Sequence, residues 1–169
     1  MPPIRLTGEQ TRDRQHVIDV LAERLRDTAP EKKIAAMFID SAFGAAIVER
    51  LHVLGFREVH EINFGAESTD PHDANKRAEM WRKMKEWLDK GAIPASDTRL
   101  EVALGGPGFH LDRKDRLVLE SKESMQKRGV HSPDDGDALA LTWAMPVRLS
   151  PPPGRPRGGW LPVSPIWAG

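Results

Sequence analysis

The spacing of hydrophobic residues in the first half of the chain predicts alternating helices and strands. Thr7, followed by Glu9 and Gln10, indicates a helix start, and apolar side chains then recur at helical spacing from Val17 to about Asp27. Lys33–Ile39 is almost continuously apolar and predicts a buried strand, and a helical pattern then continues to about Leu54. Arg57–Phe64 alternates between apolar and polar residues, which indicates a second strand. A strand, a helix and a strand within roughly 30 residues are typical of a parallel crossover unit.

The second half of the chain predicts helices around a hairpin. Residues 74–90 carry an apolar seam at helical spacing, and residues 97–104 fit a shorter helix. Two short runs, 109–111 and 116–120, flank a charged turn and predict a β-hairpin. A last helix is expected to begin at Pro133 and to continue through the apolar residues up to Met145.

The predicted last helix carries acids at its start. Ser132 is a suitable N-cap, and Asp134, Asp135 and Asp137 lie in the first turn. Asp134 and Asp137 share one face, and the apolar remainder of the helix predicts burial. The acids can serve only as caps and solubilising groups. Alternatively, two carboxylates on a rigid face can bind a divalent cation through hard oxygen ligands.

Composition narrows the protein class without indicating a function. The chain has 169 residues, 25 basic and 25 acidic, and no cysteine, which excludes a disulfide framework or a cysteine-based zinc site. Neither an apolar signal segment nor a run of about 18 apolar residues is present, so we expect a soluble intracellular protein. Prolines and glycines become frequent after Pro146, which predicts a domain of residues 1–146 and a Pro/Gly-rich tail of residues 147–169.

Asp40 follows the first predicted strand at its carboxyl end, where functional groups gather in open α/β sheets. It can simply cap the next helix. If it meets Asp134 and Asp137, three carboxylates require a cation between them. Two Mg²⁺ or Mn²⁺ ions suit such a set of ligands and would activate water for attack on a phosphodiester.

Basic residues near the acids predict contacts with DNA. Lys76 and Arg77 lie on the helix predicted for residues 74–90, and Lys122, Lys127 and Arg128 precede the acidic helix. A neutral protein can still bind DNA if its cations form a stripe. The alternative is that these cations belong to ordinary solvated helix faces.

An ordered set of short motifs resembles the carboxyl-terminal nuclease domain of phage large terminase subunits, over about residues 7 to 146. The matching residues are Phe38-Ile39-Asp40 with Gly44, Asn63-Phe64-Gly65, Asn75-Lys76-Arg77-Ala78-Glu79-Met80-Trp81 with Trp87-Leu88 and Gly91, Glu120-Ser121-Lys122, Lys127-Arg128-Gly129, and Ser132-Pro133-Asp134 with Asp137-Ala138-Leu139.

The resemblance implies a partial ribonuclease H-like α/β fold, with a central sheet, helices on both of its faces and a β-hairpin. It implies an endonuclease that uses two Mg²⁺ or Mn²⁺ ions to cut concatemeric double-stranded DNA during genome packaging in the host cytoplasm. Asp40 matches the second catalytic acid of the family and Asp134 the third, with Asp137 as a supporting acid. The implied partners are a terminase ATPase domain, a small terminase subunit and a portal.

The chain also departs from the family pattern. A phosphate loop with its lysine, the first strands and the first catalytic acid are not found, which predicts a truncated piece in which residues 1–6 are the remnant of a strand. The exposed edge of the Lys33–Ile39 strand would then favour a homodimer. The alternative function is that of a catalytically inactive prophage remnant that binds DNA or a packaging partner. A different ribonuclease H-like enzyme, such as a junction resolvase, would need a fuller acidic set.

Overall fold

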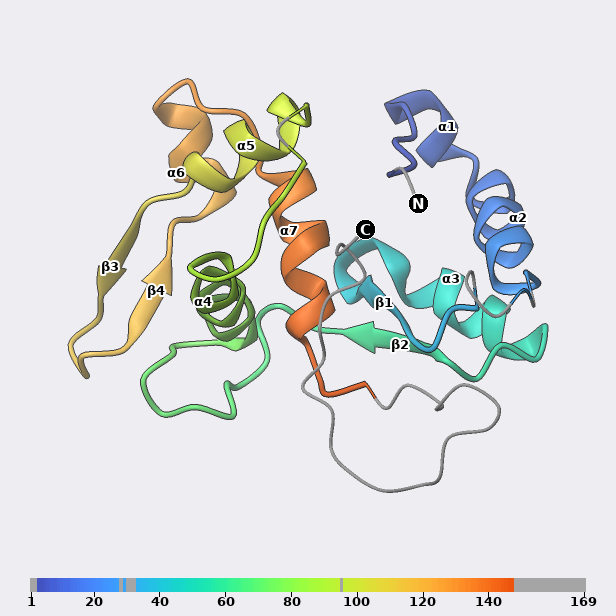
Figure 1. The fold of residues 1–169 in the computed structure, drawn as a ribbon, viewed down its shortest axis with the longest axis horizontal. Coiled ribbons are helices and arrows are strands. Elements are labelled where there is room, and N and C mark those ends of the chain that lie inside the picture. The colour runs from blue at the N-terminus through green and yellow to red at the C-terminus, as the bar shows by residue number, and fades with distance from the viewer. Residues whose placement is uncertain (1–2, 28, 30–32, 95, 148–169) are drawn as a thin grey trace. The chain divides into compact units, whose positions relative to one another are not determined.

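The protein has a mixed α/β structure with two small sheets (Figure 1). The computed structural model describes residues 3–27, 29, 33–94 and 96–147. In place of the predicted central sheet, these residues hold two separate sheets of two strands each. The chain divides into two compact units, one extending to Glu61 and one from Ile62 to Pro146. Apart from Val147, the predicted Pro/Gly-rich tail lies outside the described residues.

Two helices open the first unit where the sequence predicts one. α1 (Gly8–Arg12) begins, as predicted, at Thr7, whose side chain forms a reciprocal capping box with Gln10. It ends at Asp13, whose carboxylate accepts a backbone hydrogen bond from the first turn of α2 (Arg14–Leu25). The prediction of one continuous helix is wrong because Asp13 caps a new helix instead of continuing the first.

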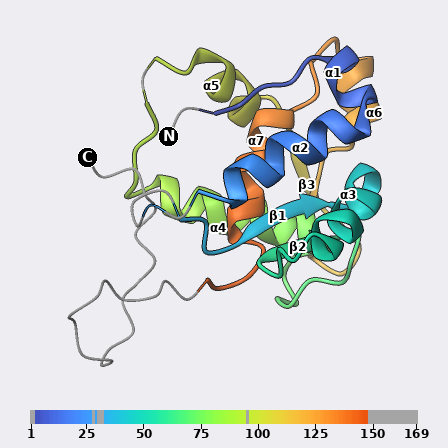
Figure 2. The same ribbon diagram turned by 90° about the vertical axis from the view of Figure 1, so that its right-hand side faces the viewer.

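A strand, a helix and a strand follow in the predicted order. They are β1 (Met37–Asp40), α3 (Ser41–Val53) and β2 (Val59–Ile62), and the two strands pair with each other (Figure 2). The prediction of a buried strand over Lys33–Ile39 is wrong, since β1 is shorter and half-buried. A strand in a two-stranded sheet has fewer neighbouring strands than a strand in the predicted central sheet, which explains why β1 is only half-buried. Residues 3–6, the predicted strand remnant, form no strand.

The core of the first unit joins α2, α3 and β2. Its buried side chains recur at helical spacing, as the apolar pattern predicts. They are Ile18, Ala22, Leu25, Val48, Leu51 and Val59. Gly44 lets α3 approach β1 closely, because a Cβ at this position would lie only 2.1 Å from Cγ2 of Ile39. This close packing fixes the end of β1, where Asp40 lies.

Three helices of the second unit pack around α7 (Asp134–Ala140). α4 (Lys76–Leu88), α5 (Thr98–Gly105) and the short 3₁₀ helix η1 (Leu141–Trp143) all contact it (Figure 1). The prediction of one helix up to Met145 is wrong, because the last turn tightens into η1. The predicted burial of the apolar part of this helix is confirmed in α7 for Ala140, whereas Ala138 is exposed and Leu139 is half-buried.

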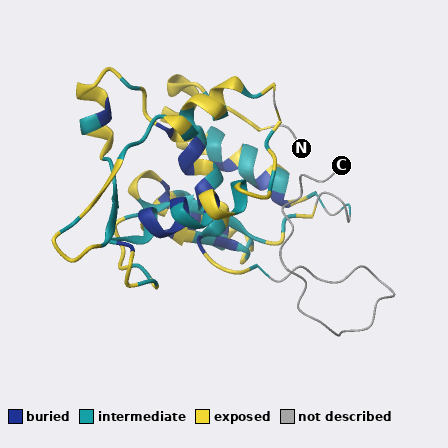
Figure 3. Ribbon diagram, turned by 60° about the vertical axis from the view of Figure 1, so that its left-hand side comes forward, coloured by how far each residue is buried: buried dark blue, intermediate teal, exposed yellow. Residues whose placement is uncertain are grey.

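The predicted hairpin is confirmed. β3 (Phe109–Leu111) and β4 (Leu117–Leu119) pair antiparallel, and β3 is exposed along its length (Figure 3). α6 (Lys122–Lys127) follows, with the Ser121 hydroxyl accepting a hydrogen bond from the Ser124 amide as its cap. The apolar pattern does not predict α6, because six residues are too few to establish a helical period.

A buried carboxylate fastens the loop that precedes α4. Glu79 has no exposed surface, and it accepts hydrogen bonds from Ser68 Oγ (3.0 Å), from Thr69 N (2.9 Å) and from Thr69 Oγ1 (2.8 Å). Lys76 and Lys83 also donate to it. Burial raises the pKa of Glu79, but the bonds from Lys83, Thr69 and Lys76 outweigh it and hold that pKa well below its usual range.

Candidate functional site

Asp134 and Asp137 lie in the first turn of α7, as the sequence predicts. Pro133 is the N-cap, and no side chain caps the helix. The prediction that Ser132 is the cap is therefore wrong. Its hydroxyl instead donates to Asp134 Oδ1 at 2.6 Å. An ionised carboxylate is a stronger hydrogen-bond partner than a neutral group, which explains this choice.

Asp134 presents its carboxylate to solvent. Its side chain is 75% exposed, and Lys122 Nζ lies 2.9 Å from its Oδ1. Partial desolvation raises the pKa of Asp134, but the hydrogen bonds from Ser132 and Lys122 outweigh this effect, so the pKa lies below its usual value. The group is thus an ionised and accessible carboxylate.

Asp137, in contrast, is buried and contacts side chains of two other helices. Its side chain is only 7% exposed. Its Oδ1 accepts from Arg77 Nε at 2.9 Å and from Trp81 Nε1 at 2.8 Å, both on α4. Its Oδ2 lies 3.4 Å from Lys122 Nζ on α6. One carboxylate therefore joins α4, α6 and α7.

Lys122 connects the two acids, because its ammonium contacts both carboxylates. Partial burial lowers the pKa of Lys122, but the bond to Asp134 and the charge of Asp137 outweigh it and raise the pKa above its usual value. The lysine is therefore charged near neutral pH. Arg77 also pairs with Asp137, so two cations balance these two anions.

The cations predicted to contact DNA fall into two groups. Arg77 and Lys76 are mostly buried, with Arg77 also donating to the Glu120 carbonyl at 2.9 Å and Lys76 paired with Glu79. Their side chains hold the unit together. Lys122, Lys127 and Arg128 lie at the surface of α6 and just after it, so the prediction of DNA contacts rests on these three.

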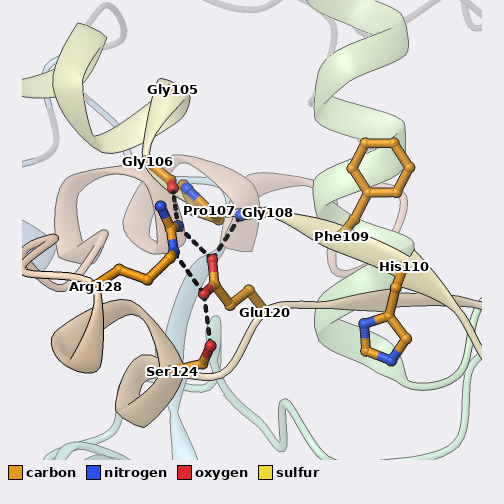
Figure 4. Close-up of a pocket in the computed structure, with 9 residues that line it drawn as sticks. All are labelled: Gly105, Gly106, Pro107, Gly108, Phe109, His110, Glu120, Ser124 and Arg128. Carbon is orange, nitrogen blue, oxygen red and sulfur yellow. Dashed lines mark hydrogen bonds and ion pairs between the residues drawn. The ribbon is translucent and has the colours of Figure 1, made fainter.

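Arg128 forms an ion pair with the Glu120 carboxylate beside a shallow hollow (Figure 4). The Glu120 oxygens accept from Arg128 Nε (2.9 Å), Ser124 Oγ (2.7 Å) and Gly108 N (2.9 Å). The Arg128 guanidinium, followed by these other bonds, lowers the pKa of Glu120 to about 2. The hollow has a volume of about 530 Å³, and Gly105, Gly106, Pro107, Gly108, Phe109, His110, Glu120, Ser124 and Arg128 line it.

Asp40 belongs to the first unit and lies at the carboxyl end of β1, as predicted. Its carboxylate accepts a hydrogen bond from the Ala42 amide at 3.2 Å and caps α3. The capping interpretation of Asp40 is therefore confirmed. Within the described ranges, no group of three or more acidic, histidine or cysteine side chains is arranged to hold a metal ion.

Sequence reasoning gave Trp81 and Glu120 no role in this region, although both belong to motifs of the resemblance. Trp81 lies 56 positions before Asp137, and no local pattern connects the two. One signal was present, namely a glycine between acids inside a predicted helix. Gly136 is buried, and a Cβ there would lie 2.7 Å from the Trp81 ring and 3.2 Å from the Ala103 carbonyl oxygen. A helical glycine can thus indicate the close approach of another element.

Gly136→Ala is expected to destabilise the second unit by about 1–2 kcal/mol, because overpacking costs more than the helix propensity gained. Trp81 cannot yield easily, since it is buried and its indole is bonded to Asp137. Urea unfolding measures the loss. Gly105→Ala is the matched control on α5, where a Cβ meets nothing within 4 Å. A Gly136→Ala protein as stable as the wild type would contradict the packing of α7 against α4.

No described helix combines the length and apolarity needed to cross a membrane. Comparison of the chain with known proteins finds no matching family model and no matching curated protein.

Proposed function

We propose that this chain is a ribonuclease H-like, metal-dependent endonuclease domain of the terminase type, which cuts concatemeric double-stranded DNA during packaging. The observation that carries the proposal is the cation shared by Asp134 and Asp137. The Lys122 ammonium forms ion pairs with both carboxylates, so the two acids contact the same positive charge. Carboxylate oxygens held in this way are the ligands that Mg²⁺ and Mn²⁺ prefer.

The acids have different roles in this proposal. Asp134 offers an accessible oxygen as a metal ligand, while Asp137 is fixed by Arg77 and Trp81 and keeps the start of α7 in place. The family resemblance assigns a catalytic role to Asp40 as well. The bound ions would supply an activated water for in-line attack on the phosphodiester.

In this proposal, the surface cations bind the DNA substrate. Lys127 and Arg128 lie at the end of α6, on the segment that leads to α7. Positive side chains at the surface attract the phosphate backbone without reading its sequence. The proposal therefore assigns DNA positioning to α6 and metal binding to α7.

Incubation of the full chain with supercoiled plasmid and Mn²⁺ tests the proposal. We expect nicked and linear DNA that EDTA abolishes, and a loss of at least about 100-fold in cleavage rate for Asp134→Asn and for Asp40→Asn, since each removes a charged ligand. Asparagine preserves the shape of both side chains and can still cap α3 at position 40. Folding is therefore expected to survive both changes.

Asp135→Asn is the matched control, because it removes a neighbouring acid from the same turn. This variant should cleave within about threefold of the wild type, which is about 0.7 kcal/mol in the barrier. Nicking that persists undiminished in both Asp134→Asn and Asp40→Asn would refute the assignment.

A second function, DNA binding without cleavage, is favoured by the state of Asp137. Both of its oxygens already contact fixed or paired cations, and little of its side chain is exposed. This function predicts a gel shift with duplex DNA that weakens steeply with salt and no cleavage with either metal. Lys127→Ala should then weaken binding to all sequences equally.

A further inference from the structure

The two edges of the β3–β4 sheet differ in what covers them. On the β4 side, the Leu117 amide donates to the His72 carbonyl at 2.7 Å, and the Leu117 carbonyl accepts from the Ala74 amide at 2.9 Å. The loop before α4 therefore closes that edge. On the other side, no strand of the described residues pairs with β3, and all of its residues are exposed (Figure 3). β3 is thus the open edge of this sheet.

The hydrogen bonds of the hairpin determine which backbone groups face the open edge. Gly108 and Asp112 each form a backbone hydrogen bond with the opposite arm of the hairpin. Hydrogen-bonded and non-hydrogen-bonded pairs alternate along an antiparallel ladder. His110 is therefore bonded to β4, whereas the amide and carbonyl groups of Phe109 and Leu111 point away from β4. These two residues direct two donors and two acceptors to the open edge.

The side chains at this edge are apolar. Phe109 is 71% exposed and Leu111 is 60% exposed, and alternation along the strand places both on one face. Phe109 and His110 point to opposite sides of β3 (Figure 4). Edge strands are usually protected from pairing by lysine, proline or a bulge, and β3 contains neither lysine nor proline. An open edge with exposed apolar side chains is suited to pairing with another strand.

A second copy of β3 fits this edge in one antiparallel register. When His110 lies on a twofold axis, Phe109 of each copy is opposite Leu111 of the other copy. All the amides and carbonyls that point outward then find partners, because both outward pairs are hydrogen-bonded pairs. The exposed apolar side chains of the two copies also meet on one face of the joined sheet. The edge is therefore complementary to itself.

The surroundings of the edge also accommodate a second copy. In this register, the hairpin tip of one copy, residues 112–116, lies beside residues 106–108 of the other copy, which line the hollow. The tip and the hollow each carry acidic and basic side chains, so opposite charges can pair. The chain has 25 basic and 25 acidic residues, so no net charge keeps two copies apart.

We propose that two copies of this chain associate through their β3 edges and form a four-stranded antiparallel sheet across a twofold axis. The contact is small because β3 has only three residues, so the dimer is weak and forms at high protein concentration. The homodimer predicted from the sequence would use the edge of the Lys33–Ile39 strand, which is a different contact. This inference does not rest on the proposed nuclease activity.

Disulfide cross-linking of the full chain tests the register. The chain has no cysteine, so a single introduced cysteine reports on one position. In His110→Cys, the two thiols face each other across the axis, at a non-hydrogen-bonded pair whose Cα atoms are about 4.5 Å apart, which suits a disulfide. Arg113→Cys is the control at the exposed tip, where the two positions are about 20 Å apart. Under mild oxidation, we expect at least about 10-fold more cross-linked dimer for His110→Cys.

Sedimentation equilibrium of the cysteine-free chain measures the association itself. Leu111→Lys places a charge on the open edge, and it is expected to raise the dissociation constant of the dimer at least about 10-fold. Val102→Lys is the matched control, because Val102 is 66% exposed and lies on α5 of the same unit. Its dissociation constant should stay within about twofold of the wild type, since scattered apolar residues at the surface are ordinary. Thermal unfolding checks that both variants keep the fold.

Two results would overturn the proposal. One is a wild-type chain that stays monomeric up to about 1 mM, which would leave the edge to a peptide strand of another protein. The other is a dimer that Leu111→Lys does not weaken. Equal cross-linking at positions 110 and 113 would contradict the twofold register.

Discussion

Asp137→Asn is expected to destabilise the second unit by about 3–5 kcal/mol, because it leaves the buried Arg77 guanidinium without its counter-charge. The substitution keeps the shape of the side chain, and its remaining oxygen can still accept the Trp81 indole. The loss therefore reports the charge pair rather than a cavity. Urea unfolding followed by tryptophan fluorescence measures it, since Trp81, Trp87 and Trp143 all lie in this unit.

Asp134→Asn is the matched control on the same helix turn. Its carboxylate is mostly exposed, and exposed ion pairs contribute at most about 1 kcal/mol. A second test combines Asp137→Asn with Arg77→Met, which removes the stranded cation. The double variant should lose less stability than the sum of the two single variants. Additive losses, or a small loss for Asp137→Asn alone, would contradict the buried pair.

Glu79→Gln is expected to destabilise the same unit by about 2–4 kcal/mol, because two lysines lose their common carboxylate inside the protein. The amide can accept from fewer donors than the carboxylate, so one of the bonds to Ser68 or Thr69 is also lost. Glu86→Gln is the control on α4, where the carboxylate is exposed and pairs with Arg82. Equal unfolding midpoints for the two variants would contradict the anchoring role of Glu79.

The pH dependence of stability provides an independent check on Glu79. Its pKa is lowered in the folded protein, so the folded state binds its proton less readily than the unfolded state. The contribution of Glu79 is therefore complete above the unfolded pKa of 4.5 and declines as the pH falls below it. Between pH 5 and pH 2, the wild type should lose stability more steeply than Glu79→Gln, by up to about 1.4 kcal/mol per pH unit. Parallel curves would contradict the lowered pKa.

The sequence predicts those features of the structure that local spacing determines. The positions of α2, α3, α4, the hairpin and the acidic start of α7 follow from apolar periods and turn residues. Asp134 and Asp137 come together because residues three apart share a helix face. The cap at Asp40 follows from its place directly before α3.

Features that depend on contacts distant in the chain were not predictable in this way. Arg77 looks like a surface cation in the sequence, but its partner Asp137 lies 60 residues away. Glu120 also has partners distant in the chain, because its carboxylate accepts hydrogen bonds from Gly108 and Arg128. The helix break at Asp13 was missed for another reason, since an aspartate inside a periodic pattern fits both a continuing helix and a cap.

The bond between Arg77 and Asp137 also constrains how this sequence can diverge. Either residue alone is costly to replace, whereas an uncharged pair of similar volume can occupy the same space. Related sequences should therefore change the two positions together, and sequences that change only one of the two should be rare. Correlated substitution at residues 77 and 137 in related sequences would be evidence for this contact.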